Sequence, residues 1–114
     1  MDADEIITNL KIIALIQKGD RITTSSHYLN IEQRSIVPQF VRRWKANECR
    51  DNAIKKINVI VNNALLSKQD LNEYILKAID GIRNLQETYT GDLQTISRLD
   101  TIIDKMVSHT QVDR

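Results

Sequence analysis

The chain has 114 residues, of which 41% are hydrophobic and 27% are charged, and its formal net charge is +1. This length suits one domain with a real core, and the composition excludes the disordered and fibrous classes. The longest apolar run, IIALI at residues 12–16, is far shorter than the roughly 20 residues that a membrane span needs. We therefore expect a soluble intracellular protein, a single helical domain over residues 1–114, with no membrane span.

The first predicted element is a helix over about 4–18. Ile6, Leu10 and Ile13 follow one another at steps of four and three, as residues on one helix face do. Gly19 supplies a helix stop. Residues 19–36 are rich in Ser, Thr and β-branched side chains, which disfavour a helix, so they predict a connector. Within it, residues 20–36 form either an extended segment or a short hairpin.

A second helix is predicted over about 38–66. Pro38 suits its first turn, because the N–H that proline lacks would have no helical partner there. The apolar stripe of this helix has hydrophobic ends, but Asn47 and Arg50 occupy its middle. The stripe therefore contains a polar interruption that the fold must accommodate.

The third predicted helix, over about 71–107, carries the longest heptad pattern in the chain. Its stripe consists of hydrophobic residues and one aspartate that alternate steps of four and three: Leu71, Ile75, Ala78, Ile82, Leu85, Tyr89, Asp92, Ile96, Leu99, Ile103 and Met106. One continuous helix is the preferred interpretation; the alternative is a kink or break near Gly91, with Asp92 capping a fourth helix. The elements together predict an all-α antiparallel bundle of three to four helices with one long C-terminal helix.

Asp92 is the one charged residue on this stripe. If the second and third helices form a hairpin, Asp92 faces Lys45, and Arg43 and Arg50 lie within about one turn of it. A carboxylate removed from water is costly unless a partner such as arginine pairs with it. We therefore predict a buried or half-buried Asp92–arginine pair, with Arg50 or Arg43 as the partner. Trp44 and Tyr89 are expected to pack around it.

The Asp92 cluster has a structural interpretation and a functional one. As a structural element, a lone polar position fixes the register of long helices at some expense in stability. As a functional element it would hold an anion or ligand. We favour the structural interpretation, because no second catalytic group lies nearby in the sequence.

Sequence patterns for metal, cofactor or catalytic sites are missing. His27 and His109 are far apart, and no paired Cys or His spacing occurs. Ser25 and Ser26 beside His27 form a polar turn rather than a catalytic array, and Cys49 is a lone thiol. We expect no cofactor, no metal and no enzymatic activity.

Positive charge is concentrated in one segment of the chain. Residues 33–56 hold seven basic and two acidic residues. Basic helices can lie along phosphate backbones, so four residues of the second helix are candidate nucleic-acid contacts: Arg42, Lys45, Lys55 and Lys56. The alternative is an ordinary solvated face, since these residues spread around the helix.

The segments RRWKANECR (42–50) and GIRNLQETYTGDLQTISRL (81–99) resemble a family of small uncharacterised helical proteins of large nucleocytoplasmic DNA viruses. The resemblance covers residues 10–106. Position by position, the motif falls on Arg43, Trp44, Arg50, Asn84, Leu85, Thr88, Tyr89 and Asp92, so the resemblance adds Asn84 to the predicted Asp92 cluster. Where the family has a second Trp and a Gly, this chain has Lys45 and Asn47. The resemblance implies a viral setting, in the host cytoplasm or in the virion, and no particular activity.

These observations predict a non-enzymatic helical protein-interaction or assembly protein, and the resemblance makes it a minor virion component. Its partners would be other protein subunits, its own copies or foreign ones, in a homo-oligomer or larger assembly. The alternative is a nucleic-acid-binding protein that uses the basic second helix.

Overall fold

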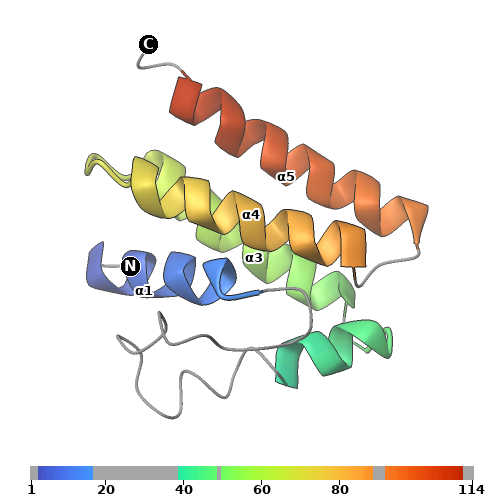
Figure 1. The fold of residues 1–114 in the computed structure, drawn as a ribbon. Helices are drawn as coiled ribbons and strands as arrows, with labels where there is room; N and C mark the ends of the chain where they lie inside the picture. Colours follow the sequence, from blue (N-terminus) through green and yellow to red (C-terminus); the bar gives the residue numbers. More distant parts are fainter. Residues whose placement is uncertain (1–2, 17–38, 49, 89–91, 112–114) are drawn as a thin grey trace.

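The structure is a computed structural model that describes residues 3–16, 39–48, 50–88 and 92–111. Its longer helices are α1 (Ala3–Ala14), α3 (Arg50–Leu66), α4 (Asn72–Thr88) and α5 (Leu93–Gln111), and residues 39–45 form a shorter helix (Figure 1). These described residues contain no strand, so the predicted all-α class is confirmed. The predicted connector, residues 19–36, lies outside the described residues.

The four longer helices form a bundle in which two of the neighbouring pairs are antiparallel and two are parallel. α1 packs against α3 and α4, and α5 packs against the same two helices. Consequently α3 and α4 occupy opposite corners of the bundle, although they are consecutive in the chain. α1 and α4 run in one direction, and α3 and α5 run in the other (Figure 1).

Hydrophobic stripes from all four helices meet in one core. Burying one Leu or Ile side chain contributes about 1.5–3 kcal/mol, so this core is the main source of stability. The predicted stripe residues that it buries are Ile6, Leu10, Ile13, Ile54, Ile57, Val61, Leu71, Ile75, Ala78, Ile82, Leu85, Leu99, Ile103 and Met106.

The expected continuous helix over 71–107 is two helices. α4 ends at Thr88, and α5 begins at Leu93 and folds back along α4. The alternative, a break with Asp92 as a cap, is the correct one. The heptad pattern crosses the break in phase because α4 and α5 both turn their apolar stripe toward the same core. A long C-terminal helix is present as α5, with 19 residues.

The expected helix over 38–66 is also interrupted. Residues 46–48 form a turn in which Asn47 has a φ of 60°, a left-handed conformation that Asn tolerates better than most residues. The Glu48 N–H donates to the Arg43 carbonyl at 2.9 Å, and the Asn47 N–H donates to the Trp44 carbonyl at 3.0 Å. This pair of bonds is the Schellman motif that ends helices, so the 39–45 helix stops here.

α1 ends at Ala14, earlier than the predicted 18, and its end lies close against α4. A Cβ added at Gly81 of α4 would clash with the backbone carbonyl oxygen of Ile13 and lie 2.9 Å from its carbonyl carbon. The Asn84 side-chain amide donates to the Ile16 carbonyl at 2.9 Å. Glycine therefore permits the close approach, and asparagine satisfies a carbonyl beyond the helix end.

Candidate interaction grooves

Asp92 caps α5 instead of pairing with an arginine. Its Oδ1 accepts a hydrogen bond from the Gln94 backbone N–H at 3.0 Å, and its Oδ2 accepts one from the Thr95 hydroxyl at 2.8 Å. The Thr95 bond, then the Gln94 bond, hold the pKa of Asp92 below its ordinary value, and the charge of Arg50 adds a smaller lowering. The prediction of a buried Asp92–arginine pair is wrong: Asp92 is exposed, and α4 does not pack along α3 as the predicted hairpin required.

Arg50 caps the 39–45 helix. Its Nε donates to the Trp44 carbonyl at 2.7 Å, and Nη2 donates to the Lys45 carbonyl at 3.4 Å. The guanidinium carbon also lies 5.8 Å from the centroid of the Trp44 ring. A cation at the negative end of a helix is favourable, and stacking on tryptophan adds a cation–π attraction. Arg50 and Trp44 meet as predicted, but they stabilise a helix end.

The remaining predicted cluster residues do not gather around Asp92. Arg43 pairs with Glu48 at 3.6 Å, and both side chains are more than half exposed. Asn84 binds the end of α1, and Tyr89 lies outside the described residues. The structure therefore brings together Arg43, Trp44 and Arg50 at one helix end, and it places Asn84 and Asp92 at two others.

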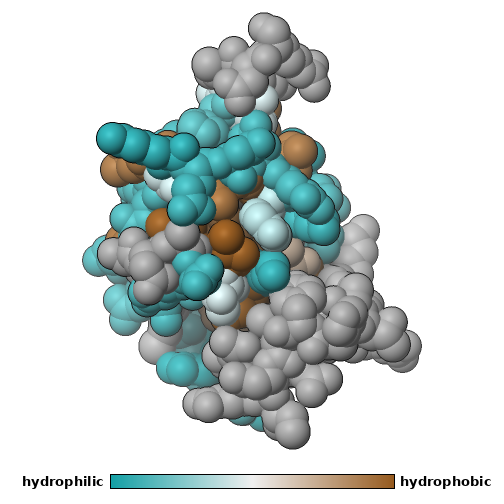
Figure 2. Space-filling model, turned by 90° about the vertical axis from the view of Figure 1, so that its left-hand side faces the viewer, coloured by the Kyte–Doolittle hydropathy of each residue, from teal (hydrophilic) through white to brown (hydrophobic). Residues whose placement is uncertain are grey.

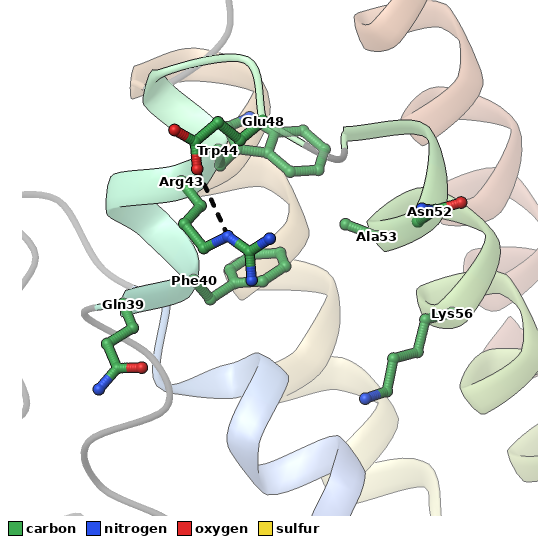
Figure 3. Close-up of a pocket in the computed structure, with 8 residues that line it drawn as sticks. All are labelled: Gln39, Phe40, Arg43, Trp44, Glu48, Asn52, Ala53 and Lys56. Carbon is green, nitrogen blue, oxygen red and sulfur yellow. Dashed lines mark ion pairs between the residues drawn. The ribbon is translucent and has the colours of Figure 1, made fainter.

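One groove, here called the apolar groove, runs between α1, the 39–45 helix and α3. It consists of two adjoining clefts with volumes of ≈ 310 and ≈ 180 Å³, and both are lined by Phe40, Ala53 and Lys56. In Figure 3, Phe40 and Arg43 of the short helix face Ala53 and Lys56 of α3 across the larger cleft. Isoleucines of α1, of the residues just after it and of α3 line the smaller cleft: Ile12, Ile13, Ile16, Ile57 and Ile60. Its lining suits an apolar side chain.

The rim of the apolar groove is basic. Lys56 reaches it from α3, and Arg43 reaches it from the short helix, beside its partner Glu48 (Figure 3). Two cations and one carboxylate therefore surround an apolar floor. Such a rim attracts an acidic group more strongly than a basic one.

A second groove, here called the cationic groove, lies between α3 and α5. Its lining residues are Ile54, Lys55, Asn58, Arg98, Thr101, Ile102 and Lys105, and its volume is ≈ 280 Å³. Lys105 Nζ donates to the side-chain oxygens of Asn58 at 2.7 Å and Asn62 at 3.2 Å. Sequence reasoning missed this groove, because no pattern in the chain shows that α3 and α5 are neighbours.

Asp51 lies beside the cationic groove and connects two of its cations. Its Oδ2 is 3.1 Å from Lys55 Nζ, and its Oδ1 is 2.9 Å from Arg98 Nη1. The hydrogen bond from Lys55, followed by that from Arg98, lowers the pKa of the Asp51 carboxyl. Both partners are substantially exposed, so the effect on stability is small.

The four predicted nucleic-acid contacts are all exposed but do not form one surface. Arg42 and Lys45 belong to the 39–45 helix, whereas Lys55 and Lys56 belong to α3. Lys55 lines the cationic groove and Lys56 lines the apolar groove. The break at Asn47 therefore divides the basic segment among separate faces.

An exposed apolar area lies at the end of the bundle where α3 ends and α4 begins. Leu66, the last residue of α3, is 81% exposed. Figure 2 shows this side of the molecule, with hydrophobic surface between hydrophilic regions.

The described residues hold no group of three or more His, Cys, Asp or Glu side chains that could bind a metal ion. His109 lies in the last turn of α5, and Ser25, Ser26, His27 and Cys49 lie outside the described residues. Nor does any described helix have the length and apolar character needed to cross a membrane.

Comparisons of the chain with protein-family models, with curated proteins and with solved structures found no match. The grooves therefore have to be interpreted from their own residues.

Proposed function

We propose that this protein is a non-enzymatic helical interaction and assembly protein, whose apolar groove docks a helix of another protein subunit. The main support for this proposal is the shape of the groove, which consists of two adjoining clefts with an apolar floor, bounded by α1, the 39–45 helix and α3. Amphipathic helices bind such grooves by inserting apolar side chains at helical spacing. The resemblance to viral proteins supports a role in a virion or in its assembly.

The outer face of α4 in a second copy of the chain has complementary chemistry. Leu76 is 53% exposed in the second turn of this helix. Glu73 and Asp80, three residues before it and four after it, are exposed on the same helix face, and Glu73 also pairs with Lys77 at 3.4 Å. An apolar side chain between two carboxylates matches an apolar floor with Lys56 and Arg43 at its rim. We therefore propose the protein's own copies as the first partner.

Sedimentation velocity of the purified chain tests the proposal. We expect a concentration-dependent mass above the 13.2 kDa of one chain. Ala53→Glu places a charge on the groove floor, and Leu76→Glu places one on the inserting face. Each variant should sediment as a monomer, because burying an unpaired carboxylate in an interface is costly.

Val59→Glu is the matched control. Val59 lies on α3, as Ala53 does, is 54% exposed and lines neither groove. This variant should associate as the wild type does. A wild-type chain that stays monomeric at millimolar concentration, or equal association by all three variants, would contradict docking of α4 in the groove.

A further inference from the structure

We propose that the cationic groove between α3 and α5 binds the phosphate backbone of duplex DNA. The site lies on the other side of α3 from the apolar groove and is independent of the assembly function. Its binding residues are Lys55, Arg98 and Lys105.

The cationic groove has an excess of positive charge. Three cations line the groove, and no carboxylate is found among the lining residues that the structure describes. Asp51 is the one carboxylate paired with these cations among the described residues, and it contacts only Lys55 and Arg98. These four side chains have a net charge of two positive; Asp104, which lines the adjoining cleft with Lys105, reduces it, but the surface still favours an anionic ligand.

The setting of Lys105 is the second argument. Lys105 is half-buried, and its ammonium is held by two neutral amide oxygens and, within the described residues, by no carboxylate. The amides orient the ammonium and leave its charge intact. Because the oxygens of Asn58 and Asn62 face the lysine, their amide N–H groups point elsewhere, and Asn58 adds a neutral donor to the groove lining.

Geometry is the third argument and selects the kind of ligand. Arg98 and Lys105 are seven residues apart on α5, which is about 10 Å along a helix, so they suit two separate phosphates better than a single anion. Proteins that bind single strands stack bases on aromatic side chains, and none of the described residues that line this groove is aromatic. Contacts to the backbone alone fit a duplex and carry no sequence preference.

Fluorescence anisotropy with a labelled 20-base-pair duplex, between about 50 and 200 mM salt, tests the site. Each phosphate contact adds about 0.9 to the slope of log affinity against log salt, so three contacts predict a loss of affinity of about 40-fold over this range. Arg98→Gln with Lys105→Gln leaves one contact, and the loss should fall to about 3-fold.

Lys68→Gln with Arg83→Gln is the matched control, because it removes the same charge from exposed positions that line neither groove. It should retain the wild-type salt dependence. If the Arg98/Lys105 variant does not fold, Lys55→Gln, whose side chain is 68% exposed, should lower the slope by about 0.9. The proposal would be overturned by wild-type protein that does not bind at 50 mM salt, by identical slopes in variant and control, or by tighter binding of the single strand.

Discussion

The two sides of α3 line grooves of different chemical character, one apolar and one cationic. Lys55 and Lys56 are consecutive in the chain, yet one lines the cationic groove and the other the rim of the apolar groove. A helix turns by about 100° per residue, so adjacent charges reach different surfaces. Net charge along a segment therefore does not define a patch, and the packing partners of the helix decide what each lysine does.

The walls of the grooves are also held differently. The 39–45 helix and α1 bound the apolar groove; a Schellman turn, Arg50 and the glycine contact of α4 fix them in place. α5 bounds the cationic groove and is tied to α3 by Lys105 and Arg98. Substitutions in the contacts that hold the walls of one groove should therefore damage that groove and leave the other intact.

Trp44→Ala should have the largest effect. Trp44 is 1% exposed and anchors the 39–45 helix, with Phe40 stacked on it at 5.7 Å between ring centroids. Truncating a buried tryptophan costs about 3–5 kcal/mol, so the free energy of unfolding in urea should fall by that amount. Self-association should be lost while duplex binding by the folded fraction persists. A loss below 1 kcal/mol would show that the short helix is not anchored by this ring.

Gly81→Ala should come next. The added methyl group meets the Ile13 backbone, which cannot rotate away as a side chain can. Overpacking costs about 1–3 kcal/mol, which exceeds the roughly 1 kcal/mol that alanine gains in helix propensity. Thermal unfolding should therefore show a lower Tm, with weaker self-association because α1 is displaced. Arg83→Ala, at an exposed position two residues further along α4 that lines neither groove, is the control and should leave Tm unchanged or slightly higher.

Asp92→Ala should have the smallest effect, and it acts on α5 alone. Losing the cap should lower Tm by about 2–6 °C at neutral pH. The folded pKa of Asp92 lies below its ordinary value of 3.8, so the charged cap stabilises the fold above about pH 4. That contribution is lost as pH falls through the folded pKa.

The pH dependence supplies the control for Asp92. The difference in Tm between wild type and Asp92→Asn should narrow on acidification from pH 6 to pH 3, because asparagine keeps the cap without the charge. A gap that widens would contradict the capping role.

The helix class and most of the core could be predicted from the sequence, because apolar periodicity reports which side of a helix is buried. The heptads through Leu71 and Met106 identified core residues correctly on both sides of the break. That same periodicity hid the break, since α4 and α5 face one core and the stripe stays in phase. Asp92 signalled a helix start, and the polar pair Asn47 and Arg50 signalled a helix end.

Neither groove could be predicted, because each depends on which helices are neighbours. The expected hairpin of the second and third helices placed α4 along α3, whereas α4 packs between α1 and α5. Once that pairing is wrong, every facing residue inferred from it is wrong as well, including the arginine partner of Asp92. The cation cluster of Lys55, Arg98 and Lys105 joins residues that no local spacing connects.

The most direct test of the central claim is a dilution series followed by amide resonances of the uniformly ¹⁵N-labelled protein. The account predicts that resonances of the apolar groove, at Ile12, Phe40, Ala53 and Lys56, shift with protein concentration together with those around Leu76. Resonances of Arg98 and Lys105 should stay fixed. Shifts confined to the cationic groove, or a spectrum that does not change with concentration, would contradict the assignment of the apolar groove as the docking surface.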